Sequence, residues 1–130
     1  MHIDHIAVWV EDLEKEKEFY QKYFGGKSGE LYHNPKKDYK HYFLSFDNGN
    51  TRLELMTQPG HDDIESRHLL KGLAHLCFSV GDKDSVLCLT ETLRSDGFEI
   101  ISEPRTTGDG AFESAVLDPE GNYIELCAAK

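Results

Sequence analysis

The chain consists of two similar halves, and each half carries one histidine and one glutamate at matching positions. The first half opens with His5 in the segment HIAVWV and closes near Glu54 in the segment NGNTRLEL. The second half opens with His75 in HLCFSV and closes near Glu125 in EGNYIEL. The histidines are 70 positions apart and the glutamates 71, an agreement that chance rarely produces. The repeat predicts the same supersecondary unit twice.

Composition limits the classes of protein to which the chain can belong. Its 130 residues are 38% hydrophobic, which is enough for the packed interior of one domain or of two small halves sharing a core. A net charge of -10 would repel a phosphate backbone, so we expect no nucleic acid partner. No signal peptide is readable and no apolar stretch approaches the roughly 18 residues that span a bilayer, so we expect a cytoplasmic protein without membrane contact.

The cysteines indicate a reducing compartment. Cys77, Cys88 and Cys127 are odd in number and show no C-x-x-C spacing. This usage argues against a disulfide framework and against a cysteine zinc site. We expect all three to be buried thiols.

Hydrophobic periodicity predicts the order βαβββ in the first half. Asp12 can cap a helix whose apolar stripe runs from Leu13 to Phe24, and Gly25 follows that helix. An Asn-Gly turn at 47–50 joins the last two strands. We expect strands at 3–10, 28–33, 39–46 and 51–56, the second of them the weakest.

The second half repeats this order. A helix over 83–95 ends before Gly97, and a turn at 118–121 supplies proline and glycine between the last two strands. We expect strands at 74–80, 98–102, 113–117 and 122–127, and a loop at 104–110. The chain therefore reads as one α+β domain over residues 1–130, with modules 1–57 and 72–130 joined by a polar connector at 58–71.

Strand alternation predicts that the four repeated residues share a face. Leu53 and Leu55 point to one side of their strand, so Glu54 points to the other, and Glu125 is placed in the same way. The aliphatic sides pack on helices, which would leave two imidazoles and two carboxylates on the opposite, concave side. Burying unpaired carboxylates costs several kcal/mol unless a cation compensates. We therefore predict a divalent metal site at His5, Glu54, His75 and Glu125.

The paired modules, and the motifs HIAVWVEDL and LDPEGNYIEL, resemble the vicinal oxygen chelate superfamily. This superfamily includes glyoxalase I, bleomycin resistance proteins, extradiol dioxygenases and methylmalonyl-CoA epimerase. The resemblance covers nearly the whole chain and implies two βαβββ modules that form a curved, cup-like mixed sheet with the helices on its outer face.

The order His, Glu, His, Glu is closest to glyoxalase I, a lactoylglutathione lyase, whereas dioxygenases present two histidines and one glutamate. The resemblance implies nickel or zinc, with cobalt or manganese as alternatives, and proton transfer through a metal-bound enediolate of a hemithioacetal. It implies Glu125 as the base, with Glu54 as a ligand and second base.

Two positions depart from the glyoxalase I pattern. Trp9 replaces an arginine that meets the glutathione carboxylate, and Gln58 replaces an asparagine. Arg52 and Arg105 are candidates to replace that anion contact, and Trp9 and Tyr123 are candidates for the wall of a small-molecule site, with Phe112 a further aromatic beside them. The remaining histidines have no repeat partners, and we expect them to be surface groups: His2, His33, His41, His61 and His68.

Two function classes stay open. The first is a metal-dependent lyase or isomerase of glyoxalase type. The second is a binding protein like the bleomycin resistance proteins, which sequesters a small molecule without chemistry. The complete ligand set favours the enzyme, because costly carboxylates have no evident use in a metal-free binder. The resemblance also implies a homodimer, in which the site forms within one chain or across two.

Overall fold

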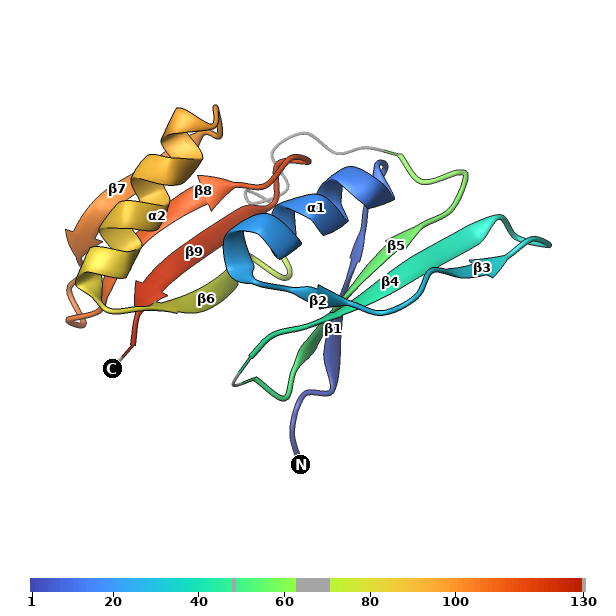
Figure 1. Cartoon of the computed structure of the whole chain (residues 1–130), viewed down its shortest axis with the longest axis horizontal. Coiled ribbons are helices and arrows are strands. Elements are labelled where there is room, and N and C mark those ends of the chain that lie inside the picture. The colour runs from blue at the N-terminus through green and yellow to red at the C-terminus, as the bar shows by residue number, and fades with distance from the viewer. Residues whose placement is uncertain (48, 63–70, 130) are drawn as a thin grey trace. The chain divides into compact units, whose positions relative to one another are not determined.

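The computed structural model describes residues 1–47, 49–62 and 71–129 (Figure 1). Contacts divide the chain into two compact units, residues 1–63 and residues 64–130, and this boundary falls inside the predicted connector. The first unit contains β1 (His5–Trp9), α1 (Leu13–Phe24), β2 (Lys27–Ser28), β3 (Tyr32–Asn34), β4 (Tyr39–Ser45) and β5 (Arg52–Thr57). The second contains β6 (Leu76–Gly81), α2 (Lys83–Ser95), β7 (Ile100–Thr106), β8 (Phe112–Leu117) and β9 (Tyr123–Ala128).

Each unit holds one mixed sheet, and the two sheets have the same topology. The strand order is β1-β5-β4-β2 in the first, with β3 also on β4, and β6-β9-β8-β7 in the second. The outer pairs β1 with β5 and β6 with β9 are parallel, whereas the remaining pairs are antiparallel. The predicted α+β fold with two βαβββ modules is confirmed.

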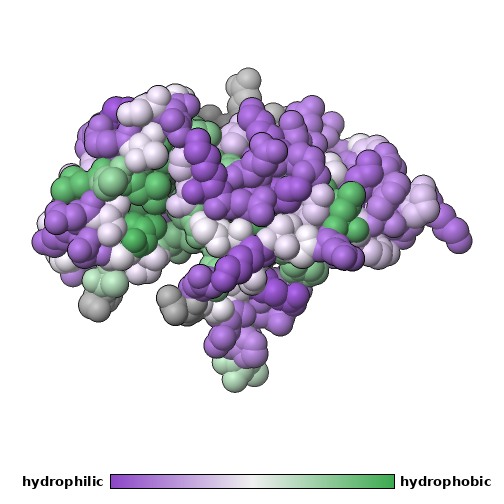
Figure 2. Space-filling view, in the orientation of Figure 1, coloured by the Kyte–Doolittle hydropathy of each residue, from purple (hydrophilic) through white to green (hydrophobic). Residues whose placement is uncertain are grey.

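In each unit one helix covers one face of the sheet, and the core of that unit lies between its helix and its sheet (Figure 1). In the first unit, Phe19 and Tyr20 of α1 are buried with Leu44, Leu53 and Leu55 of the sheet. The second unit uses smaller side chains in the same arrangement, and its buried members include Val86, Leu93, Val116, Ile124 and Leu126. The outward side of α1 is mostly hydrophilic, as Figure 2 shows. None of the helices in the described ranges has the length and apolar character that crossing a membrane requires.

The helix ends follow the predicted capping chemistry. The Asp12 side chain accepts a hydrogen bond from the Lys15 amide at 3.0 Å, and Gly25 takes a left-handed conformation at φ 67° after α1. Asp82 caps α2 in the same way, accepting from the Ser85 amide at 2.8 Å. Each cap satisfies an amide that has no partner within its helix.

The edge strands differ from prediction. The weak strand predicted at 28–33 is two short pieces, β2 and β3, which pair with successive parts of β4. The loop predicted from Pro104 is wrong in its first part, because β7 continues through Thr106. Pro104 is tolerated because β7 is an edge strand whose register shifts between Ser102 and Arg105. At an edge or a bulge, some backbone amides form no hydrogen bond within the sheet, so a proline can take such a position.

The turn predicted at 118–121 is present. The buried Asp118 carboxylate accepts from the amides of Glu120 at 3.1 Å and Asn122 at 2.8 Å, and Gly121 adopts φ 83°. The Asn-Gly turn at 47–50 includes residue 48, and the connector includes residues 63–70, so both fall partly outside the described residues.

The prediction that all three cysteines are buried is wrong. Cys77 and Cys88 are exposed and Cys127 is half-buried. Cys88 lies on the outward side of α2, since Val86, Thr90 and Leu93 form its buried side. Cys77 is the register partner of Glu125, so it shares the sheet face that bears the predicted site rather than the core face.

Candidate metal centre

His5 and Glu54 lie together on the first sheet. Parallel pairing of β1 with β5 aligns His5 with Arg52 and Ala7 with Glu54, which makes His5 and Glu54 diagonal neighbours on one face. The His5 Nε2 atom lies 3.5 Å from Oε2 of Glu54. Glu54 is only 8% exposed, whereas its strand neighbours Leu53 and Leu55 belong to the core on the other side.

Asp4 orients the His5 ring. The His5 Nδ1 atom donates to Oδ2 of Asp4 at 2.9 Å, because an ionised carboxylate only accepts. Arg52 forms an ion pair with the same carboxylate. The hydrogen bond from His5, and then that from Arg52, holds the pKa of Asp4 below its ordinary value. In the neutral His5 ring, Nε2 then presents a lone pair toward Glu54, an arrangement that a cation would stabilise.

Glu54 has two further partners that sequence analysis missed. The Tyr39 hydroxyl donates to Oε1 of Glu54 at 3.2 Å, and Nδ1 of His41 contacts the same oxygen. Burial raises the pKa of Tyr39, and the Glu54 charge adds to the rise. The interpretation of His41 as a surface group is wrong, since its side chain is only 18% exposed. Alternation along β4 places Tyr39, His41 and Phe43 on one face, and this signal could have found both residues.

The second sheet presents a matching pair. The His75 Nε2 atom lies 3.2 Å from Oε2 of Glu125. His75 immediately precedes β6, and Glu125 lies in β9, the parallel neighbour of β6. The Tyr123 ring centroid is 5.8 Å from that of His75, and burial, followed by the Glu125 charge, raises the Tyr123 pKa.

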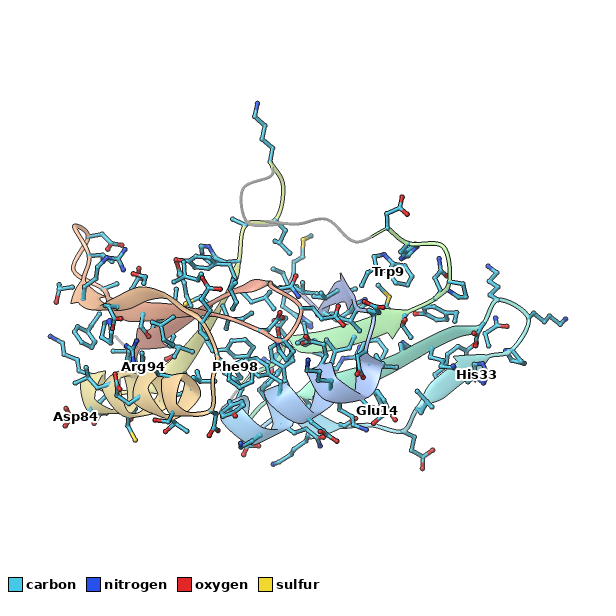
Figure 3. The ribbon with its side chains drawn as sticks, turned by 90° about the horizontal axis from the view of Figure 1, so that it is seen from above. Trp9, Glu14, His33, Asp84, Arg94 and Phe98 are labelled. Carbon is cyan, nitrogen blue, oxygen red and sulfur yellow. The ribbon has the colours of Figure 1, made fainter. Side chains whose placement is uncertain are left out.

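The candidate substrate residues lie near these pairs, and both arginines are engaged. Trp9 is 39% exposed and lies on the side of the first sheet opposite to α1 (Figure 3). Its ring contacts those of Tyr39 at 6.1 Å and His61 at 4.0 Å. Arg52 forms an ion pair with Asp4, and its guanidinium carbon lies 4.2 Å from the Phe43 ring centroid. Arg105 donates to Ser102 Oγ at 2.8 Å and lies 3.4 Å from Glu113.

The other predicted surface histidines differ in their contacts. His2, His33 and His61 are exposed. His33 lies 3.2 Å from Asp38, and His61 lies 2.9 Å from the Gln58 amide nitrogen. The remaining histidine, at position 68, is outside the described residues.

The donor atoms of each pair suit a divalent ion. Two ligands bound at about 2.1 Å with angles of roughly 90–110° stand about 3.0–3.4 Å apart. The measured separations of 3.5 Å and 3.2 Å are close to this range, and the imidazole and carboxylate donors are those that zinc and nickel accept. Within 1–47, 49–62 and 71–129, no three His, Cys, Asp or Glu side chains gather as a metal cluster, so each sheet supplies one pair.

A match to a protein-family model shows which superfamily the chain belongs to. The model of the Glyoxalase/Bleomycin resistance protein/Dioxygenase superfamily matches residues 2–126. The chain belongs to this superfamily. The resemblance inferred from its motifs is thereby confirmed, and the matched range includes both His/Glu pairs.

Similar proteins include two kinds of named enzyme. Mitochondrial methylmalonyl-CoA epimerase of Bos taurus is 31% identical over 95% of this chain and 72% of its own length. Lactoylglutathione lyase GLX1 of Arabidopsis thaliana is 31% identical over 94% of this chain and 42% of its own length. The crystal structure of glyoxalase I from Zea mays superposes with a TM-score of 0.78 at 27% identity, covering 98% of this chain and 44% of that one. The chain thus spans less than half of these two plant proteins.

Proposed function

We propose that this protein is a metal-dependent enzyme of the glyoxalase I type, which moves a proton at a carbon atom next to a carbonyl group of a small molecule. The observation that carries the proposal is the pair of equivalent contacts, His5 with Glu54 at 3.5 Å and His75 with Glu125 at 3.2 Å. Two sheets with equivalent strand order each turn one imidazole and one carboxylate away from their core. That arrangement supports one four-ligand site better than it supports surface ion pairs.

Each side chain has a role in this proposal. His5, Glu54, His75 and Glu125 hold a divalent ion, with nickel or zinc favoured over cobalt or manganese. When bound, the ion supplies a Lewis acid that stabilises negative charge on the substrate oxygen. Glu125 accepts the proton from carbon and returns it to the neighbouring carbon, while Glu54 serves as a ligand.

The surroundings of the pairs bear on the substrate. Arg52 and Arg105 already have carboxylate partners, so an anionic substrate group would have to compete with Asp4 or Glu113. Trp9 offers aromatic surface beside Tyr39, which donates to Glu54, and Tyr123 offers it beside His75. We propose a thiol hemithioacetal as the substrate class, with the four residues Trp9, Arg52, Arg105 and Tyr123 as its contacts.

A second candidate reaction is epimerisation of an acyl thioester. The 31% identity with the bovine epimerase over 72% of its length favours it. Both reactions begin by removing a proton next to a carbonyl group, so the same carboxylate would serve either. They differ in the substrate and in the carbon that receives the proton, which is the neighbouring carbon in the glyoxalase-type reaction and the opposite face of the same carbon in epimerisation. Parallel assays of hemithioacetals and of acyl-CoA thioesters separate them.

Metal content of protein purified without an affinity tag or chelator tests the proposal. We expect about one divalent ion per chain in the wild type, and loss of nearly all of it in either His5→Ala or His75→Ala, because one four-ligand site needs both pairs. Glu125→Gln should retain part of the metal and lose turnover. If nickel, zinc, cobalt and manganese all fail to bind the wild type, the enzyme proposal fails and the non-catalytic binding protein remains.

A further inference from the structure

The strand registers show that the two glutamates have different neighbours. Glu54 pairs with Phe43 of β4, and Glu125 pairs with Ala115 of β8. Two residues before each of these partners, on the same face of the sheet, stand His41 in the first unit and Glu113 in the second. Four residues before them stand Tyr39 and Ala111. The repeat that makes the glutamates equivalent therefore breaks at the side chains beside them.

In the first unit both of these neighbours contact the same oxygen of Glu54. His41 contacts Oε1 through Nδ1, and the Tyr39 hydroxyl donates to the same atom at 3.2 Å. Since an ionised carboxylate only accepts, the His41 contact is donated by Nδ1–H. Glu54 is 8% exposed, so bulk water competes little for this oxygen. With Oε1 held by two donors, Oε2 has a fixed direction, toward His5 Nε2 at 3.5 Å.

The side chains at the same positions in the second unit provide no hydrogen-bond donor for Glu125. Alanine at 111 carries no polar side chain, and an ionised carboxylate at 113 cannot donate. Glu113 instead lies 3.4 Å from Arg105 and places a second negative charge on the strand next to Glu125.

We propose that Tyr39 and His41 are positioning residues that lock Glu54 as a permanent ligand, so that proton transfer is left to Glu125. This inference rests on the proposed metal site, and it explains why two repeat-equivalent carboxylates would take different roles. It concerns the first unit alone, because Tyr39, His41 and Glu54 all lie on β4 and β5.

Cobalt binding to the purified full chain tests the inference without an activity assay. His41→Leu removes the donor at similar volume, whereas His41→Asn keeps an N–H near the place of Nδ1. We expect His41→Leu to weaken Co²⁺ affinity about 10- to 100-fold and to change the visible cobalt spectrum, since partners of a ligand typically have effects of this size. Tyr39→Phe should weaken affinity by a smaller factor, and His41→Asn should restore most of it.

Glu113→Gln is the matched control, because it alters the equivalent position in the second unit. It should leave Co²⁺ affinity within about threefold of the wild type, with thermal unfolding of the metal-free variants showing that each is folded. Wild-type affinity and spectrum in His41→Leu would overturn this inference alone. Equal losses in His41→Leu and His41→Asn would overturn it too, because the donor would then be irrelevant. Failure of the wild type to bind Co²⁺ would overturn the proposed function and this inference with it.

Discussion

At the scale of single residues, the contacts around His5 show how a histidine is prepared as a ligand. Asp4 accepts from Nδ1 at 2.9 Å, which directs Nε2 toward Glu54. The corresponding position before His75 is alanine, so among the described residues the preceding side chain gives this support in the first half of the repeat only. The asymmetry parallels that around the glutamates, and in both cases the first unit holds its ligand more firmly.

We expect Asp4→Ala to weaken binding of a divalent metal about 10- to 100-fold, because the ring loses the partner that fixes its tautomer and orientation. Asp4→Asn, which keeps an acceptor oxygen, should lose less. Competition titration with a chromophoric chelator measures the change. Asp47→Ala removes an exposed carboxylate that pairs with Lys27 at 2.6 Å and is the control for charge alone. An equal loss in Asp47→Ala would contradict the orienting role.

Tyr39 should titrate later than a tyrosine in water. Burial first, and the Glu54 charge second, raise its pKa above the ordinary value of 10.0. Its contribution to stability is therefore complete below the unfolded-state pKa and is lost as pH rises through the folded-state pKa. The tyrosinate absorbance of wild type minus that of Tyr39→Phe should show a midpoint above pH 10. A difference curve with its midpoint at or below that pH would refute the buried contact with Glu54.

At the scale of elements, short capping side chains fix where the helices begin. Asp12 and Asp82 each accept from the amide three residues on. We expect Asp12→Ala and Asp82→Ala each to lower the free energy of unfolding by about 0.5–2 kcal/mol, and Asp12→Asn to lower it far less, because asparagine caps almost as well. Urea unfolding followed by circular dichroism measures the changes. Equal losses for Asp12→Ala and Asp12→Asn would show that charge, rather than capping, is responsible.

Alternation and capping predicted the central strands and both helices to within one or two residues. The edge strands were harder, because they exchange hydrogen bonds on one side only and tolerate interruption. Pro104 in β7 and the break between β2 and β3 are both of this kind. The positions of His5, Glu54 and Glu125 on their strands agree with the alternation argument, since these side chains lie away from the buried aliphatic residues.

At the scale of the whole molecule, chain length bears on assembly. The chain matches 42% of the Arabidopsis lyase and 44% of the maize glyoxalase I, so a protein of that size has room for about two such chains. We therefore expect a homodimer, in which the metal site forms either within one chain or across the two chains.

Mixing two variants that do not bind metal distinguishes a site across chains from a site within one chain. His5→Ala and His75→Ala should each bind almost no metal alone. After unfolding and refolding together, a site across chains would pair an intact first unit with an intact second unit in every mixed dimer. Random reassortment of a twofold dimer then restores roughly a quarter of the wild-type metal content. No recovery, despite mixed dimers detected by native mass spectrometry, would place all four ligands in one chain.

The sequence by itself determined the two modules, their helices and central strands, and the four residues of the proposed centre, because period, caps and an internal repeat are local properties of the chain. Alternation gives the face of a strand but not the contact partner of a side chain, so tertiary structure alone decided which side chains contact those four. His41 has no repeat partner and reads as a surface residue, yet pairing of β4 with β5 brings it onto Glu54. Arg52 and Arg105 read as candidates for an anion contact with substrate, yet the folded chain pairs each with a carboxylate. Contacts between strands depend on register, and register is set by packing of the whole sheet.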